Sequence, residues 1–324
     1  MRTRELAFLA VLAGCLAAGP GTARATLLAY EPFLAGGASP NLAAGQYTNG
    51  VPFPGDQLLG QGPAALGFAG GSIWTNNSGS GYNANVYYRT QAGQDAYTDG
   101  NGYQLNTSAG QLNLQRNAGT SSDSDKNAVR TLALGGSLPD VMYISFLASM
   151  TAGDHVRLSS GATDGSSTQR FFFGASTTRN PFVTGWTGSA YTNVVNSGVT
   201  ISTNTTHLFV ARIRDNGDDV NDEIALYLDP LLASEGLNTP AAELTLGNFY
   251  VAGDAGWTLA DVYLRGRAVD TPSSVLADEI RIGTTWADVT PYTVPEPSVA
   301  ATLLVGLTLL ARRLRTGRAT GRRP

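Results

Sequence analysis

Short apolar segments with the two-residue period of a β-strand recur along this chain, and residues 26–293 show no convincing helical period. Ile224, Leu226 and Leu228 occupy alternate positions, as in a strand with one buried face, whereas residues 141–148 are apolar on both faces, as in a central strand. Further strands are expected at 155–159, 169–173, 207–214, 261–265 and 278–282. Turn residues separate these segments at intervals of about 10 to 15 residues, so the sequence predicts an all-β, two-sheet antiparallel sandwich.

The first 25 residues have the three parts of a secretory signal peptide. Arg2 and Arg4 form a basic start, residues 6–18 are apolar, and residues 23–25 have the small-x-small pattern that precedes cleavage. We therefore expect an exported protein that passes through the Sec machinery and is cleaved after residue 25.

The only cysteine of the chain, Cys15, lies inside this leader. Residues 12–15 resemble the lipobox of lipoproteins, which implies acylation of Cys15 as the alternative to cleavage after residue 25. Cleavage after residue 25 would leave a mature protein without cysteine, and would exclude disulfides, thiolate nucleophiles and thiolate metal sites.

The C-terminal residues 294–324 combine a proline-rich motif, an apolar run at 299–311 and an arginine-rich end. The motif consists of Val294, Pro295, Glu296, Pro297 and Ser298. This order resembles the PEP-CTERM sorting tail of Gram-negative bacteria. The resemblance implies that an exosortase, a membrane protease-transpeptidase, cuts near the Pro-Glu-Pro, and that the body ends at the cell surface or outside the cell.

The length of the apolar run suits a temporary anchor. A helix of the 13 residues 299–311 spans about 20 Å, whereas the hydrocarbon core of a bilayer is about 30 Å thick. Snorkelling arginine side chains and local thinning of the bilayer compensate for the difference. Six arginines and no acids follow residue 311, which places this end in the cytoplasm. We expect a transmembrane segment at 299–311 that holds the protein in the inner membrane before processing.

Between the two signals, residues 26–293 form one expected domain with a strongly acidic balance. Of the 25 acidic residues of the chain, Glu5 and Glu296 lie outside it, and of the 21 basic residues nine do. The domain therefore has 23 acids and 12 bases, a formal charge of −11. A phosphate backbone requires a basic face, so a nucleic-acid partner is excluded.

Four segments of this domain resemble a known architecture. Residues 27–33 and 277–283 look like the first and last strands of the concanavalin A-like lectin/glucanase jelly roll, in the LamG-like form of bacterial surface proteins. Residues 211–215 and 224–230 are similar to a hairpin of those domains. The resemblance implies a jelly-roll sandwich over residues 26–293 whose two terminal strands lie side by side.

The same resemblance places Glu31 and Glu279 on one face of the edge sheet. It implies a non-catalytic, lectin-like surface or matrix protein that binds extracellular polysaccharide. Two alternatives stay open, namely a polysaccharide-cleaving enzyme, either glycoside hydrolase or lyase, and a purely structural or adhesive coat protein.

Catalytic patterns are weak in this sequence. Glycoside hydrolases of this architecture carry a Glu-x-Asp-x-x-Glu strand, because retaining chemistry needs two carboxyl groups about 5 Å apart. None of the seven glutamates begins that pattern. Asp278 and Glu279 are neighbours on an expected strand, where side chains alternate between faces, so we expect Glu279 to have a structural role and to pair with Arg281 or with a neighbouring strand. His155 and His207 each begin an expected strand and lack a companion at ligand spacing, so we expect them at strand ends or on the surface.

Aromatic side chains provide the platforms on which sugar rings stack, and the loop-rich segment 38–127 is rich in them. The expected sugar-binding residues are Trp74, Tyr82, Tyr87 and Tyr88, with Tyr97 and Tyr103 as further candidates. The other three tryptophans, Trp186, Trp257 and Trp286, are expected to be buried.

One turn, residues 215–223, has five carboxylates. Hard cations bind several oxygens around a flexible turn, so calcium is the cofactor that this turn suggests. The candidate ligands are Asp215, Asp218, Asp219, Asn221 and Asp222. The spacing does not match an EF-hand, and a solvated hairpin turn explains the same residues, because Asp, Asn and Gly tolerate turn conformations. No other cofactor is indicated.

Overall fold

The computed structural model describes most of the expected domain and little outside it. The described residues are 26–33, 66–69, 72, 74, 86–89, 96–108, 111–115, 126–134, 139–151, 155–160, 171–186, 191–216, 222–246, 261–267 and 274–294. The predicted signal peptide, Cys15 and the predicted membrane segment at 299–311 lie outside these residues. Within them, no helix has the length and apolar character needed to cross a membrane.

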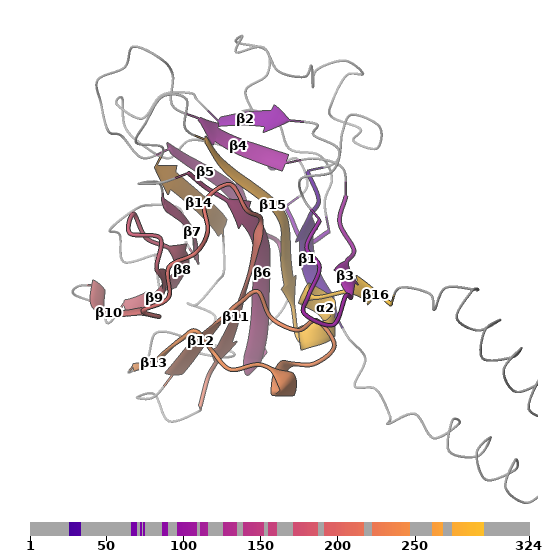
Figure 1. Cartoon of the computed structure of the whole chain (residues 1–324), viewed down its shortest axis with the longest axis vertical. Helices are drawn as coiled ribbons and strands as arrows, with labels where there is room; N and C mark the ends of the chain where they lie inside the picture. Colours follow the sequence, from indigo (N-terminus) through magenta and orange to yellow (C-terminus); the bar gives the residue numbers. More distant parts are fainter. Residues whose placement is uncertain are drawn as a thin grey trace, which may run out of the picture.

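The larger of the two main sheets has eight strands (Figure 1). Their order is β13-β12-β11-β6-β15-β4-β2, and β1 also pairs with β15. The strands are β1 (Leu27–Glu31), β2 (Val86–Arg89), β4 (Gln111–Gln115), β6 (Val141–Ser149), β11 (His207–Arg214), β12 (Asp222–Leu228), β13 (Ala242–Leu246) and β15 (Ser274–Gly283).

The second main sheet has six strands in the order β10-β9-β8-β7-β14-β5. They are β5 (Lys126–Thr131), β7 (His155–Ser160), β8 (Phe171–Ala175), β9 (Pro181–Trp186), β10 (Tyr191–Asn196) and β14 (Asp261–Arg267). The remaining described elements are short, namely β3 (Gln104–Leu105), β16 (Tyr292–Thr293), the 3-10 helix η1 (Glu235–Leu237) and the helix α2 (Trp286–Val289).

The path of the chain through the two sheets confirms the predicted architecture. The strand pairings within both sheets are antiparallel. Successive strands β4, β5, β6 and β7 alternate between the two sheets, as do β13, β14 and β15. Repeated crossing between two antiparallel sheets is the connection pattern of a jelly roll. The predicted strand at 207–214 has the same bounds as β11, and the one predicted at 278–282 is the second half of β15.

The main core fills the space between the sheets. Phe146 of β6 stacks on Phe209 of β11 with 5.0 Å between ring centroids, and it packs against Phe173 of β8 at 5.6 Å. Alternate residues of β6 belong to this core, namely Met142, Ile144, Phe146 and Ala148. Because side chains alternate along a strand, these residues all point to the same side of the larger sheet. We call this side, which faces the second sheet, the inner face.

The opposite, outer face of the larger sheet is also partly covered by apolar side chains. Tyr143 and Leu147 of β6 belong to a second buried cluster, together with Leu232 and with Trp286 of α2. The Trp286 ring meets that of Tyr143 edge-on at a centroid distance of 6.2 Å. Burial on both sides explains why residues 141–148 are apolar at almost every position, as expected for a central strand. Trp286 is buried, as predicted.

The two terminal strands lie side by side, as the resemblance implied. β1 pairs with β15 in antiparallel register, with Tyr30 opposite Arg281 and Glu31 opposite Ile280. β15 is long enough to pair with β4 through its first half and with β1 through its second half, while β6 lies along its other edge. This strand therefore has more strand neighbours than any other described strand of the sheet.

Glu31 and Glu279 do not share a face, and the expectation that they would was wrong. Glu31 points inward and forms an ion pair with Arg130 of β5, in the opposite sheet, with both side chains 1% exposed. Glu279 instead accepts a hydrogen bond from the hydroxyl of Tyr30, the neighbour of Glu31 on β1. Because neighbouring strand residues point to opposite faces, the two glutamates lie on opposite sides of the larger sheet.

The ion pair of Glu31 and Arg130 is a buried link between the sheets. Burial raises the pKa of the Glu31 carboxyl, and the Arg130 guanidinium opposes this shift. Arg130 also lies over the Phe68 ring, with its guanidinium carbon 4.4 Å from the ring centroid. The Glu31 carboxylate accepts a second hydrogen bond from the backbone N–H of Phe33 at 3.1 Å.

We predict that Glu31→Gln destabilises the protein, because it removes the negative charge beside a buried guanidinium while it keeps the side-chain volume. Loss of one partner of a buried ion pair costs about 3–5 kcal/mol, whereas replacement of both partners by apolar residues is often close to neutral. Urea unfolding monitored by tryptophan fluorescence gives the free energy of unfolding of each variant. The double variant Glu31→Leu/Arg130→Met should be more stable than Glu31→Gln, and a lower stability of the double variant would contradict this account.

Candidate functional site

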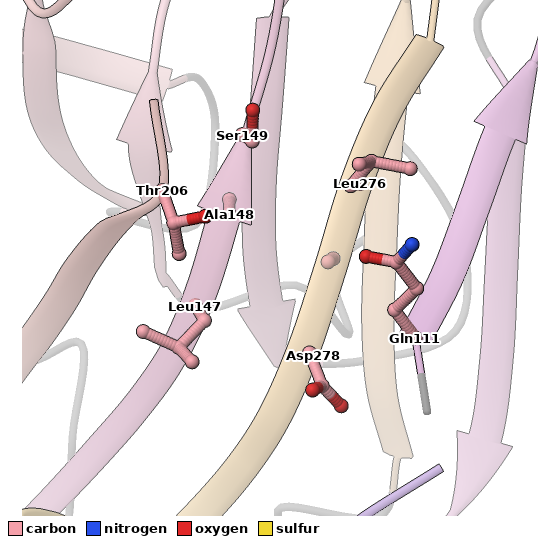
Figure 2. Close-up of a pocket in the computed structure, with 8 residues that line it drawn as sticks. Gln111, Leu147, Ala148, Ser149, Thr206, Leu276 and Asp278 are labelled. Atoms are coloured by element: carbon pink, nitrogen blue, oxygen red, sulfur yellow. The ribbon is translucent and has the colours of Figure 1, made fainter. Parts of the chain in front are cut away.

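A hollow on the outer face of the larger sheet is the candidate site (Figure 2). It lies between β6 and β4, with β15 in the middle, and its cavity volume of about 10 Å³ has room for about one water molecule. Its lining consists of Gln111, Leu147, Ala148, Ser149, Thr206, Leu276, Ala277 and Asp278. An amide, a carboxylate and two hydroxyls therefore lie next to an apolar floor, which is the composition of a small-molecule binding surface.

Ordinary alternation along β15 places Asp278 at this hollow, and a β-bulge follows directly after it. Ala277 and Ile280 both belong to the inner core, although they are three positions apart instead of two. The register against β6 shifts between Asp278 and Arg281, and Glu279 has a positive φ of 55°. The extra residue lets Glu279 bond to groups on the outer side that Asp278 already lines, so the expected alternation between these two neighbours does not hold.

Glu279 is fully buried and hydrogen-bonded through both carboxylate oxygens. Its Oε1 accepts from the hydroxyl of Ser108 at 2.7 Å and from the backbone N–H of the same residue. Its Oε2 accepts from the hydroxyl of Tyr30 at 2.7 Å and from Arg281 Nη2 at 2.6 Å. The predicted pairing of Glu279 with Arg281 is confirmed, and this carboxylate holds the bulge in place.

Tyr30 is a fixed donor in this network. Burial and the negative charge of Glu279 raise the pKa of its hydroxyl well above the ordinary value of 10.0. The Arg281 guanidinium carbon also lies 4.9 Å from the centroid of the Tyr30 ring. The tyrosine therefore stays protonated and connects the first strand of the domain to the bulge in the last long one.

A second polar cluster occupies the outer face of the larger sheet, at the carboxylate of Glu235. Oε2 of Glu235 accepts from the Tyr143 hydroxyl at 2.6 Å, and its Oε1 accepts from the Tyr227 hydroxyl at 2.5 Å. Arg212 of β11 pairs with Glu235 and with Glu223. Burial raises the pKa of Glu235, but the two tyrosine hydroxyls and the Arg212 charge outweigh it, so the pKa is lowered. Glu235 is thus held as a carboxylate.

Residues 229–241, which we call the strap, connect β12 to β13 across this face. Its Leu232 is fastened by three hydrogen bonds. The indole N–H of Trp286 donates to the Leu232 carbonyl at 3.0 Å, and the Thr290 hydroxyl donates to the same carbonyl at 3.2 Å. The backbone N–H of Leu232 donates to Asp99 Oδ2 at 2.8 Å. The strap and α2 cover the second apolar cluster.

His207 holds the start of the strap next to the hollow, since it follows the lining residue Thr206. Its Nδ1 lies 2.6 Å from Asp229 Oδ2, and its Nε2 lies 3.2 Å from the carbonyl of Ser202. The side chain of His207 is 9% exposed, so it begins a strand as expected but is not a surface group. Burial lowers its pKa, but the hydrogen bond and charge of Asp229 outweigh this effect and the pKa is raised.

Three of the six aromatic residues considered as sugar-binding candidates lie elsewhere. Trp74 is 0% exposed and stacks on Phe33 at 5.6 Å, so it belongs to the core and is not a surface platform. Tyr97 is buried, and its hydroxyl donates to the carbonyl of Pro230 in the strap at 2.8 Å. Tyr103 stacks on Tyr292 at 4.9 Å. The apolar area of these rings favours burial wherever a neighbouring strand or loop covers them.

Two of the remaining candidates are near the hollow in the sheet. The backbones of Tyr87 and Tyr88 lie in β2, opposite Asn113 and Leu112 of β4, and Arg89 lies opposite the lining residue Gln111. Tyr82 and Trp257 lie outside the described residues, and Trp186 ends β9.

The predicted calcium turn is only partly described. Asp215 follows β11, and its backbone N–H donates to the carbonyl of Asp140 at 2.9 Å. Asp222 begins β12 and is 1% exposed, which differs from a solvated turn residue. Asp218, Asp219 and Asn221 lie outside the described residues. Among those that are described, no three His, Cys, Asp or Glu side chains form a group that could hold a metal ion. Calcium binding at this turn stays a prediction.

Sequence reasoning missed Gln111, Ser149 and Thr206 as members of the site. They come from β4, from β6 and from the residue before β11, and no local motif connects them. Asp278 was considered only as an unfavourable catalytic partner of Glu279. The signal that could have found it is the three-residue spacing of apolar positions at 277 and 280, which is typical of a bulge.

Comparisons with known proteins show only distant similarity. No family model matches the chain, and no curated protein matches its sequence. Three of the solved structures to which the chain is distantly similar illustrate this. The endo-β-1,4-glucuronan lyase of the fungus Trichoderma reesei has 12% identity and a TM-score of 0.37 over 68% of this chain and 98% of its own. The β-glucanase of Bacillus licheniformis has 14% identity and a TM-score of 0.35, over 70% of this chain and 99% of its own. The exoplasmic/lumenal domain of VIP36, with Ca²⁺ and Man3GlcNAc bound, has 8% identity and a TM-score of 0.35, over 62% of this chain and 97% of its own.

These similarities are too weak to transfer an activity. The assignment of a two-sheet antiparallel sandwich depends on the strand pairings of this chain itself.

We predict that the stabilising effect of His207 depends on pH. The pKa of His207 is raised in the folded protein above its ordinary value of 6.5. The contribution is therefore complete below the ordinary pKa and is lost as the pH rises through the folded pKa. The free energy of unfolding should differ more between wild type and His207→Gln at about pH 5 than at about pH 9. His155→Gln is the matched control, and a difference for His207→Gln that does not change with pH would contradict the assignment.

Proposed function

We propose that this protein is an exported, non-catalytic carbohydrate-binding sandwich that holds extended polysaccharide weakly at the hollow on the outer face of the larger sheet. The observation that carries the proposal is the lining, in which Gln111, Ser149, Thr206 and Asp278 surround an apolar floor at an open mouth. Sugars present hydroxyls and apolar ring faces together, and such a surface matches both.

The arrangement of carboxylates supports binding over cleavage. Retaining hydrolysis needs a nucleophile and an acid about 5 Å apart, both facing the sugar. Asp278 is the one carboxylate among the residues that line the hollow, and its neighbour Glu279 is buried with both oxygens hydrogen-bonded. A hydrolase or lyase would have to use Asp278 with a different partner, so a cleaving enzyme is the second candidate.

Weak affinity follows from the chemistry of the lining. Each hydroxyl exchanges water for a protein hydrogen bond with a net gain of about 1 kcal/mol. Three or four such bonds correspond to dissociation constants nearer millimolar than nanomolar. Multiple contacts along a polymer would be needed for strong retention.

We predict that wild-type protein migrates more slowly in native gels that contain a soluble polysaccharide it binds. The panel should include neutral, amine-bearing and acidic polymers. Ser149→Phe fills the hollow, and Gln111→Leu removes its amide without changing its size, so each should reduce the retardation at least about fivefold. Glu243→Gln, on the far edge strand β13, is the control and should behave as wild type.

Two results would contradict the proposal. Retardation that persists in Ser149→Phe would place binding elsewhere, with Tyr87 and Tyr88 of β2 as the next residues to change. Release of reducing ends or of unsaturated sugars by the wild type, lost in Asp278→Asn, would promote the cleaving enzyme.

The proposed location depends on the two terminal segments. The leader at 1–25 supports export through the Sec machinery, with Cys15 acylation as the alternative, and the segment 294–311 supports recognition by an exosortase after temporary anchoring in the inner membrane. The mature domain would then reach the cell surface or the extracellular matrix.

We predict that protein isolated from the surface of its own cells lacks the residues beyond about 298, because cleavage near the Pro-Glu-Pro removes the apolar run and the arginines. Intact mass spectrometry of native material measures both ends of the chain. Recovery of a chain that extends to Pro324 at the final location would refute processing, and a lipid mass on Cys15 would favour the acylated alternative.

A further inference from the structure

The carboxylate of Asp288 lies beside the first residue of the expected mature chain. Asp288 is 8% exposed. Its Oδ2 accepts hydrogen bonds from the backbone N–H groups of Thr26 at 3.2 Å, Thr284 at 3.1 Å and Thr285 at 2.8 Å. It also accepts from the Thr285 hydroxyl at 2.9 Å. The backbone at residue 26 is therefore held at a buried carboxylate of α2.

The partners of this carboxylate are all uncharged. In the described part of the chain, none of the arginines and histidines that form ion pairs is paired with Asp288. Buried charges in proteins are usually balanced by an opposite charge. Within the described residues, Asp288 therefore has hydrogen-bond donors but no cation.

The local backbone fixes Thr26 at this carboxylate. Gly283 lies opposite Leu27 in the pairing of β15 with β1. A Cβ atom at position 283 would lie 2.3 Å from the Cβ atom of Asp288, so the glycine makes room for the carboxylate. The backbone N–H of Thr284 donates to the carbonyl of Thr26 at 3.2 Å. The beginning of β1 and the turn before α2 are thus adjacent (Figure 1).

We propose that Asp288 is the binding site for the N-terminal α-ammonium group of the mature protein, which forms when the leader is cleaved between residues 25 and 26; this inference rests on the proposed export and cleavage. Hydrolysis adds water across that peptide bond. Residue 25 leaves with a carboxylic acid, and the Thr26 nitrogen becomes an amine that takes up a proton at neutral pH.

Cleavage would strengthen the contact between β1 and α2. A charge-assisted hydrogen bond is roughly twice as strong as a neutral one, so the ammonium group is a better partner for Asp288 than the amide that it replaces. Acylation at Cys15 would instead leave residues 15–25 in front of Thr26, and the contact would stay neutral.

The test uses the full chain in a form with one reactive amine. Lys126 is the only lysine of the sequence, so Lys126→Arg leaves the N-terminal α-amine as the sole primary amine. This chain is exported from a Gram-negative host and purified in mild detergent. Intact mass spectrometry should show Thr26 as its first residue. Acetylation of the folded protein then removes the positive charge and keeps one N–H donor.

Acetylation should raise the equilibrium constant of urea unfolding at least about threefold at about pH 6, because a neutral hydrogen bond replaces a charge-assisted one. In Asp288→Asn, the same acetylation should change that constant by less than about 1.5-fold, because the interacting charge is already gone. Glu243→Gln removes a carboxylate that is 51% exposed on β13, so it is the control and should keep the effect of the wild type.

A second measurement does not depend on the folding of Asp288→Asn. The ordinary pKa of an α-amine is about 7.7–8.0, and a neighbouring carboxylate raises it in the folded protein. The groups that face the amine from the turn before α2, Thr284 and Thr285, are neutral. The stabilising contribution is complete below the ordinary pKa and is lost as the pH rises through the folded pKa, so the effect of acetylation should disappear by about pH 10.5.

The outcomes separate this inference from the proposals on which it rests. A chain that begins at Thr26 but is equally stable with and without acetylation at about pH 6 would overturn the inference and leave leader cleavage standing. So would an acetylation effect of the same size in Asp288→Asn. A different first residue, such as an acylated Cys15, would overturn the cleavage and the inference with it. None of these results affects carbohydrate binding at the hollow.

Discussion

The bulge at Glu279 in β15 is the constraint on which the described structure depends most. A non-glycine residue in the left-handed region costs roughly 1–2 kcal/mol. Hydrogen bonds to a charged group contribute about 1.5–3 kcal/mol each, and the Glu279 carboxylate accepts them from Tyr30, Ser108 and Arg281. The network therefore outweighs the backbone strain. It also joins β1, the segment before β4 and β15 at one point, so the first and last strands of the domain are fixed together.

The location of the candidate site follows from what covers the outer face. A sheet buried on both sides has no surface left for a ligand, and the strap and α2 bury the outer face around Tyr143, Leu147 and Trp286. The hollow lies beside Leu147, where Asp278 and Gln111 replace apolar side chains. His207 and Asp229 hold the start of the strap next to Thr206. The strap that covers one part of the outer face is therefore fastened next to the part that stays uncovered, where the hollow lies.

Local pattern predicted much of the fold, because strand periodicity is written in consecutive residues. β6, β11 and the contact of Glu279 with Arg281 were expected from the residues themselves, whereas the pairing of the terminal strands was implied by the resemblance to concanavalin A-like domains. Failures occurred where the outcome depends on distant residues. Trp74 was expected on the surface because its neighbours in sequence are typical of loops, yet Phe33 covers it. The faces of Glu31 and Glu279 were assigned from strand pairing alone, without the bulge and without Arg130 on the opposite sheet.

The sequence by itself determined an all-β domain with antiparallel strands and a strongly acidic composition that argues against binding to nucleic acids. It also contains the motifs at both ends on which the proposed location rests. These properties depend on residues that are neighbours in the chain or on simple counts. Only the tertiary structure decided that Gln111, Ser149, Thr206 and Asp278 line one hollow, since they come from separate segments of the larger sheet. It also decided that Glu279 is a buried structural carboxylate, because burial and hydrogen-bond partners are set by packing between segments far apart in the sequence.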